Sequence, residues 1–409
     1  MKKLMTILIY SFILLLLLPL SCAKGEIKLL EKETLFNIEY GRMEDQIDIG
    51  AAAENYSPRK NRITMQNGIF HISNGRSAKI MEFNSYGEIL NLYYNSGENP
   101  EPVILTKQQQ GEQTSTRNVY AYPFKDVGEI AIDSGKRLYI DDRIAENRVE
   151  HDDGLGVPLD RIILQFNQSG EYIDYLGQEG SGGTPFSYIE KIRISDRDEL
   201  IVFTRNTQGW KIFWFSSEGR PLYIVDINSD ALPFPNEEEK EHSFADLETI
   251  ESDQINRFLY IKIDYYIDHS MKLDSEETGI SFNNSVIWTL DISKGEYDEW
   301  VEIPSYLKEE DKPQVYEDET TNLLYEFIGT SGDGIFYLIS LDGRNSYNLM
   351  LLNRNGQVIQ TSGIDMGPDR LMIQEFYISK NGILTGLLGW EENMEVAWWR
   401  TDKFLGKEE

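Results

Sequence analysis

The side chains that could do chemistry in this chain are few, and the best group among them is an acidic loop with one histidine. His151, Asp152 and Asp153 precede a glycine and lie close in sequence to Asp141 and Asp142, whereas the other three histidines are scattered. Oxygen-rich loops with a glycine turn suit calcium, although the spacing is not that of an EF-hand. These five residues are the candidate metal ligands. A solvated acidic loop is the alternative, because such charges usually stay exposed.

Cys22, the only cysteine, follows an apolar segment near the start of the chain. Two lysines precede the apolar run 7–20, and a small serine stands just before the cysteine. A charged start, an apolar core and a small residue before the cut are typical of a secretory signal peptide. The run is also shorter than the about 20 residues that span a bilayer. We therefore expect residues 1–21 to be removed, which leaves Cys22 at the new N-terminus.

Residues 18–22, Leu-Pro-Leu-Ser-Cys, resemble the lipobox of bacterial lipoproteins, although the resemblance would prefer leucine at Pro19. It implies that Cys22 is the lipid-attachment site, carrying palmitate or similar acyl chains, and that residues 22–34 form a lipidated tether. Two buried chains suffice for stable anchoring. The expected location is the cell envelope, lipid-anchored to a membrane on its extracytoplasmic side, either periplasmic or surface-exposed. A secreted protein with a stray thiol is the alternative.

The charge of the chain argues against anionic partners. The formal net charge is −30, and removal of the two signal-peptide lysines makes it −32. Such a protein is repelled by phosphates, so nucleic-acid binding is not expected. The acidic segments 233–252 and 309–319 are expected to be solvated loops or short helices, or else to hold a basic partner. No cofactor is expected apart from the calcium considered above.

The mature chain predicts an all-β fold in one large unit, residues 35–405. Short runs rich in Ile, Val, Tyr, Phe and Trp alternate with Gly, Asn, Asp and Ser turns, and long amphipathic helical periods are almost absent. One hairpin pattern, an apolar strand followed by polar residues, a glycine and a second strand, recurs at 83–89, 166–172, 215–221, 290–297 and 352–358. Its glycine suits a tight connection that needs a positive φ. Five copies imply five copies of one β-unit.

The remaining strands predict a six-bladed β-propeller closed by both termini. Residues 371–400 supply three strands and no fourth, and residues 35–41 fit the missing outermost strand. Such closure removes two exposed edges. The expected blades are 60–120, 121–180, 181–235, 255–305, 320–365, and 366–404 with 33–41. A β-sandwich or a two-domain all-β protein is the alternative.

Two stretches carry a family resemblance. Residues 124–141 look like the start of an NHL-type blade, and residues 180–203 repeat the pattern with Ser195 where the family has Asp. The whole mature chain also resembles the six-bladed propeller lipoproteins of spirochaetes, which share the stretch 35–48. The resemblance implies a fold and an extracytoplasmic setting, and it brings no catalytic residues.

The leading functional hypothesis is therefore a membrane-anchored, non-catalytic propeller that binds a protein or an envelope component. The chain has no Gly-x-Ser-x-Gly motif and no phosphate-binding loop. The alternative is a metal-dependent hydrolase or lactonase with an ion in the central channel, for which Asp133, Asp198 and Asp264 could lie near inner-strand ends. Most of the seven tryptophans are expected between blades, and a minority could form a binding surface.

Overall fold

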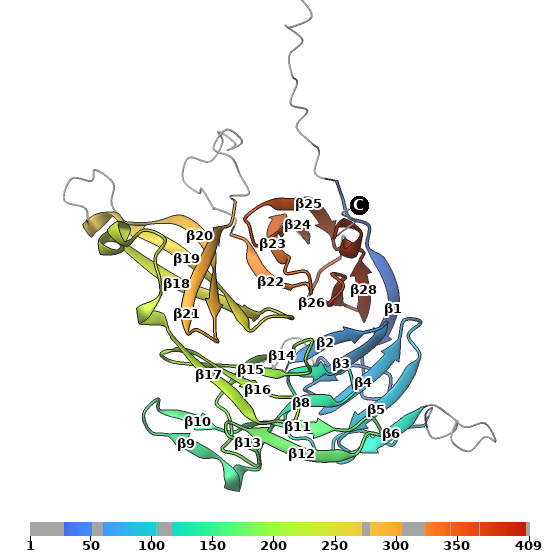
Figure 1. Cartoon of the computed structure of the whole chain (residues 1–409). Coiled ribbons are helices and arrows are strands. Elements are labelled where there is room, and N and C mark those ends of the chain that lie inside the picture. The colour runs from blue at the N-terminus through green and yellow to red at the C-terminus, as the bar shows by residue number, and fades with distance from the viewer. Residues whose placement is uncertain are drawn as a thin grey trace, which may run out of the picture.

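Strand pairing in the described part of the chain gives six sheets of four or five strands that surround one axis (Figure 1). The computed structural model describes residues 28–50, 60–103, 105, 117–271, 279–304, 324–343, 345–367 and 369–405. The expected signal peptide, Cys22 and the acidic segment 309–319 lie outside these residues. No helix in the described ranges is long and apolar enough to cross a membrane.

Each sheet is one blade, and its strands lie side by side in order from the axis to the rim. Blade one comprises β2 (Asn61–Gln66), β3 (Ile69–Asn74), β4 (Lys79–Asn84) and β5 (Ile89–Tyr94), with β6 (Asn118–Ala121) added in parallel. Blade two comprises β7 (Ile130–Ile132), β8 (Leu138–Arg143), β11 (Arg161–Phe166) and β12 (Tyr172–Gly177), with β13 (Gly180–Ser181) at its edge. Blade three comprises β14 (Ile189–Ile194), β15 (Leu200–Asn206), β16 (Gly209–Phe215) and β17 (Pro221–Asn228).

The other three blades complete the ring. Blade four comprises β18 (Ser243–Ser252), β19 (Phe258–Asp268), β20 (Ile280–Asp291) and β21 (Glu296–Glu302). Blade five comprises β22 (Glu326–Thr330), β23 (Phe336–Gly343), β24 (Ser346–Leu352) and β25 (Val358–Asp365). Blade six comprises β26 (Ile373–Ile378), β27 (Leu384–Gly389), β28 (Asn393–Trp399) and, outermost, β1 (Glu33–Glu39). A small hairpin of β9 (Glu150–Asp152) and β10 (Val157–Leu159) projects from blade two. The helical turns are η1 (Glu146–Arg148), η2 (Ser229–Ala231), η3 (Glu237–His242), η4 (His269–Met271) and η6 (Thr401–Phe404).

The predicted closure of the ring is confirmed. β1 pairs antiparallel with β28, and Phe36 lies opposite Val396. The Phe36 ring also packs against Phe70 and Phe83 of blade one, with centroids 5.8 and 5.3 Å away. One strand from the start of the chain therefore completes blade six and seals its contact with blade one.

The five predicted hairpins occupy equivalent places, each joining the third strand of a blade to the fourth. All five glycines have φ between 72° and 77°, namely Gly87, Gly170, Gly219, Gly295 and Gly356. A side chain is strained in this left-handed region, which explains why glycine recurs there. Blade six lacks the hairpin because its outermost strand is β1, which comes from the other end of the chain.

The predicted start of blade four is wrong. We expected residues 233–252 to be loop or short helix and the blade to begin near 255, but β18 already begins at Ser243 and is the innermost strand. Only η3 matches the expected short helix. The strand was missed because its acidic side chains alternate with apolar ones such as Leu247 and Ile250, which are buried.

Packing between neighbouring blades forms the core. The tryptophans at 210, 214, 288 and 399 are buried in it, as expected for most of this residue type, whereas Trp300 on β21 is exposed. The clusters join faces of adjacent sheets; for example, Tyr260 of blade four meets Phe336 of blade five with ring centroids 4.8 Å apart. Every blade is thus held by its two neighbours.

Candidate functional site

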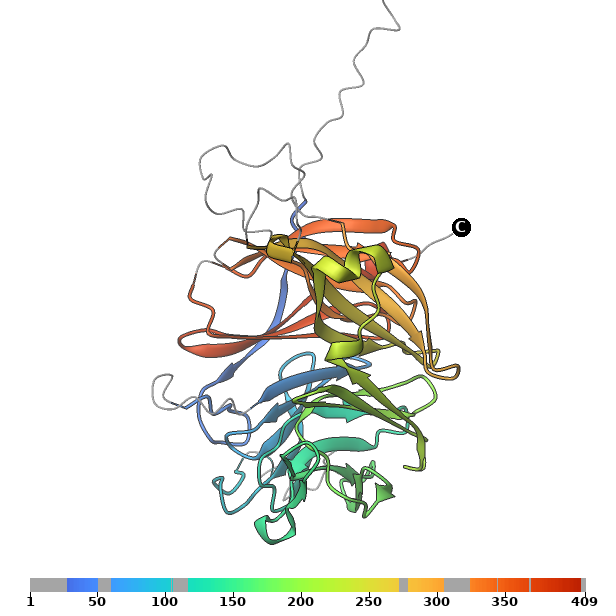
Figure 2. The ribbon, with the colours of Figure 1, turned by 90° about the vertical axis from the view of Figure 1, so that its left-hand side faces the viewer.

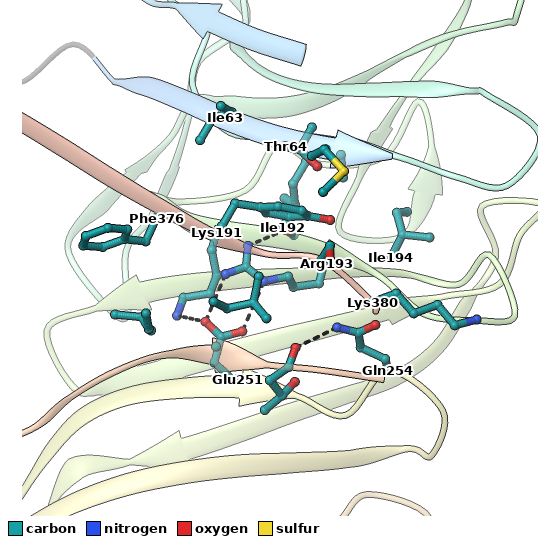
Figure 3. Close-up of a pocket in the computed structure, with 18 of the residues that line it drawn as sticks. Ile63, Thr64, Lys191, Ile192, Arg193, Ile194, Glu251, Gln254, Phe376 and Lys380 are labelled. Carbon is teal, nitrogen blue, oxygen red and sulfur yellow. Dashed lines mark hydrogen bonds and ion pairs between the residues drawn. The ribbon is translucent and has the colours of Figure 1, made fainter. Parts of the chain in front are cut away.

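The innermost strands of the six blades enclose a central channel. β2, β7, β14, β18, β22 and β26 line a cavity of about 830 Å³ along the axis (Figure 3). Charged side chains of these strands line the channel, and the turns that follow the strands form one of its mouths. The channel therefore brings together segments from all six blades that are far apart in sequence.

Glu129 is the centre of one buried ion-pair network in the channel. Its carboxylate accepts hydrogen bonds from Lys60 Nζ at 2.9 Å and Arg62 Nε at 2.6 Å. Lys60 also donates to the carbonyl oxygen of Ile189 in blade three, and Arg62 also pairs with Glu375 of blade six. Burial alone would raise the pKa of Glu129, but the two cations outweigh it and hold the pKa at about 2. The network joins four blades around a carboxylate that is charged at neutral pH.

Glu251 is the centre of a second network between blades three and four. Lys191 Nζ lies 2.6 Å and Arg193 Nη2 3.0 Å from its oxygen Oε1, and Figure 3 shows both cations pointing from β14 toward it. Burial would raise the pKa of Glu251, but Arg193 and Lys191 lower it below the usual range. A metal ion or substrate cation could reach Glu251 only by displacing these partners.

Two further carboxyl groups of the channel hold protons more tightly than usual. Burial raises the pKa of Glu248 to about 7 and that of Glu375 also to about 7, despite nearby cations. Glu248 lies 3.4 Å from Lys262, a fully buried lysine that is itself paired with Asp264 at 2.8 Å. These groups can change protonation near neutral pH.

The mouth at the turns that follow the inner strands is narrowed by hydrogen bonds between neighbouring turns. They run from Ser134 Oγ to Asp198 (2.6 Å), from the amide of Asp196 to the carbonyl of Gln254 (2.7 Å), from Gln254 Nε2 to the carbonyl of Thr330 (2.8 Å), and from the amide of Gly332 to the carbonyl of Lys380 (2.8 Å). The side chain of Lys380 then crosses the axis from blade six and lies 2.7 Å from Asp196 of blade three. This mouth is therefore spanned by the protein's own groups.

The three acids proposed for an axial metal are not brought together. Asp133 ends the inner strand of blade two and accepts a hydrogen bond from the amide of Arg137, and Asp198 is held by Ser134 in the mouth. Asp264 lies in β19, the second strand of blade four, and pairs with Lys262. Two of them thus lie at inner-strand ends as expected, each in a structural role.

The candidate calcium ligands divide into two places. Asp141 on β8 is buried and pairs with Arg161 at 2.7 Å, and Asp142 accepts hydrogen bonds from the amides of residues 125 and 126. His151, Asp152 and Asp153 belong to the projecting hairpin, where Asp152 caps its own turn. Among the described residues, no three His, Cys, Asp or Glu side chains are grouped to hold a metal ion. The calcium hypothesis stays a prediction.

The functional groups that sequence reasoning missed are the paired charges of the channel. Glu129 and Arg193 stand inside the two stretches that resemble NHL blades, and Arg62 holds a similar place in β2. Each is a charged residue within or beside an apolar inner strand. That repeated placement is the signal that could have found them.

A second candidate surface lies on the long strands of blade four. Phe244, Tyr266 and Phe282 are cross-strand neighbours on β18, β19 and β20, with ring centroids 5.1 and 5.8 Å apart. Phe244 is 42% exposed, and nearby Ile280 is 62% exposed. We call these four residues the aromatic row. Figure 1 shows the strands that carry it extending outward at the upper left.

Acidic side chains flank the aromatic row. Asp246 and Asp268 stand two residues from Phe244 and Tyr266 along their strands and therefore share their face of the sheet. Burial and the charges of Asp264 and Asp246 raise the pKa of Tyr266. Toward the other end of β19 the same face is covered by blade five, which packs against Tyr260. The aromatic row thus lies on the face of blade four that packs against blade five, beyond the part that blade five covers.

Comparison with known proteins finds solved structures of low similarity, which carry no argument about this chain. No protein-family model and no curated protein matches the chain. Among solved structures, an ulvan lyase is similar with 12% identity, 90% of this chain and 83% of that chain covered and a TM-score of 0.41. A gluconolactonase from Xanthomonas campestris is similar with 9% identity, 91% of this chain and 97% of that chain covered and a TM-score of 0.39. A streptogramin B lyase is similar with 10% identity, 89% of this chain and 99% of that chain covered and a TM-score of 0.37. Similarity at this level carries no inference about activity.

Proposed function

We propose that the protein is a lipid-anchored, extracytoplasmic binding module, acylated at Cys22, whose propeller holds another protein without catalysing a reaction. The observation that carries this proposal is the exposed aromatic row on blade four. Aromatic side chains are enriched at the centres of protein interfaces because they bury much area in defined geometry. The resemblance to propeller lipoproteins of spirochaetes supports the anchor.

The partner expected at the aromatic row is a protein with a positively charged surface. Asp246 and Asp268 flank the row, and Glu241 is exposed at the end of η3 close to the start of β18. Complementary charges around an apolar centre speed association and select against acidic partners. Because these acidic groups lie at the rim of the surface, raising the salt concentration should weaken the complex.

The experiment is site-specific photo-crosslinking on native membranes. A photoreactive residue replaces Phe244, and in a control protein it replaces Leu222, which is 39% exposed on β17 of blade three. We expect one discrete protein adduct from position 244 that decreases at high salt, and none from position 222. Equal adducts from both positions, adducts with lipid alone, or no adduct would refute the proposed surface.

The alternative of a metal-dependent hydrolase requires free ligands on the axis. Glu129 and Glu251 are each engaged by two cations, and Lys380 crosses one mouth. The residues present in the described channel therefore do not fit a resident ion without rearrangement. Calorimetric titration with calcium and with manganese separates the two functions, because a site of one ion per chain with a raised melting temperature would favour the hydrolase.

A further inference from the structure

The first described residues of the chain are fastened to the outermost strand of blade five. The amide of Gly363 donates to the carbonyl of Lys28 at 3.1 Å, and the amide of Leu30 donates to the carbonyl of Gly363 at 2.8 Å. Lys32 Nζ then donates to the carbonyl of Met366 at 3.0 Å. Figures 1 and 2 both place this segment beside β25 at the upper edge. The chain thus joins the propeller at its rim, away from both mouths of the channel.

The distance from this point to the anchor is short. Lys28 is six positions after Cys22 in the sequence, and an extended chain covers at most about 3.5 Å per residue, so the two lie within about 20 Å of each other. The orientation inferred below rests on the proposed acylation of Cys22. With acyl chains buried in the bilayer, the rim of blade five lies within that distance of the membrane surface.

The chemistry of this rim suits a bilayer surface. Val358 and Ile359 on β25 are 44% and 38% exposed, and Leu29 beside the strand is 62% exposed. The strand is uncharged until its last residue, Asp365, whereas β21, the outermost strand of blade four, has four acidic residues in seven. In a chain of net charge −30, an uncharged apolar edge is the part least repelled by anionic headgroups.

We propose that β25 and Leu29 form the membrane-facing edge of the propeller, so that the ring stands edge-on to the bilayer. Leu29, Val358 and Ile359 lie in the headgroup region, where burial of each apolar side chain is favourable. Both mouths of the channel then open sideways to water. The occupant of this surface is lipid, unlike that of the aromatic row.

The test compares two positions at opposite edges of the ring. Ile359→Cys lies on β25 of blade five, and Ile173→Cys is the matched control on β12, the fourth strand of blade two, where Ile173 is 50% exposed. Acylated Cys22 has no free thiol, so a fluorescent maleimide attaches only to the introduced cysteine. The full-length acylated proteins are placed in phosphatidylcholine vesicles that contain lipid with a nitroxide on its headgroup. We expect severalfold stronger quenching at position 359 than at 173.

The outcomes separate the orientation from the anchor. Incorporation of a clickable fatty acid and flotation with the vesicles are measured on the same samples. Acylated, floating protein with equal quenching at the two positions, or with stronger quenching at 173, overturns the edge-on orientation and leaves the anchor intact. Absence of acylation overturns the proposed anchor and the orientation with it.

Discussion

Replacing Glu129 with glutamine removes the charge that holds two buried cations in the channel. The pKa of this carboxyl falls from 4.5 to about 2 in the folded protein, and a pKa difference of one corresponds to about 1.4 kcal/mol. The charged form therefore contributes about 3 kcal/mol to folding. This agrees with the about 3–5 kcal/mol usually lost when one partner of a buried ion pair is removed. We expect Glu129→Gln to lower the free energy of unfolding by about 3 kcal/mol at pH 7.

The pH dependence of that loss gives a sharper test. Because the folded-state pKa is depressed, the stabilisation is fully present above pH 4.5 and is lost as the pH falls toward 2. The difference in free energy of unfolding between wild type and variant should therefore shrink as the pH falls from 4.5 toward 2. Urea unfolding followed by tryptophan fluorescence measures this difference. Glu299→Gln, an exposed change on β21, should alter stability by less than about 0.5 kcal/mol. A loss below about 1 kcal/mol for Glu129→Gln, or one that does not vary with pH, refutes the reasoning.

Three further changes test other parts of the fold. Gly170→Ala should destabilise the protein far more than Gly295→Ala. Both glycines have positive φ, but a Cβ atom at position 170 would lie 2.1 Å from the Tyr120 ring, whereas a Cβ atom at position 295 would meet no other atom. Equal melting temperatures of the two variants would contradict this. Glu248→Gln should match wild type in stability at pH 4 and exceed it at pH 8. Glu248 ionises near pH 4.5 in the unfolded chain but keeps its proton up to about pH 7 in the folded protein, so wild-type stability falls between these two pH values. Equal urea midpoints for the two proteins at pH 8 would contradict this. Phe36→Ala should lower the free energy of unfolding by about 3–5 kcal/mol, as for other buried phenylalanines. It should also make β1 more sensitive to limited proteolysis. If the variant resists proteolysis as well as the wild type does, closure through β1 is refuted.

The ring could be predicted because its signals are local. In blades one to five a glycine at positive φ occupies the turn from the third strand to the fourth, so Gly87 and Gly356 mark equivalent turns that are far apart in sequence. The missing outermost strand in the last blade then indicated β1. Blade four was misplaced because the acidic residues of β18 resemble a solvated segment unless their alternation with buried Leu247 and Ile250 is weighed.

The charged channel could not be predicted in the same way. Glu129 and Glu375 are 246 residues apart and become neighbours of Arg62 only when the ring brings blades one, two and six together. Nothing within either segment shows whether a charge on an inner strand will meet an opposite charge, a ligand or water. The candidate acids chosen from sequence were instead those at visible turns, such as Asp133 and Asp152, whose carboxylates cap their own backbone.

The segment that leads into the closing strand β1 would be the first part of the propeller to receive a load from the proposed anchor. A pull on Cys22 reaches the hydrogen bonds of Lys28 and Leu30 with blade five before it reaches β1. Lys32 then shares the load, since it bonds to Met366 of blade five and pairs with Glu395 of blade six. Because two blades take the force before the pairing of β1 with β28 is stressed, tethering at this end does not require opening of the closure. The position of the anchor next to the closing strand is therefore compatible with a stable ring.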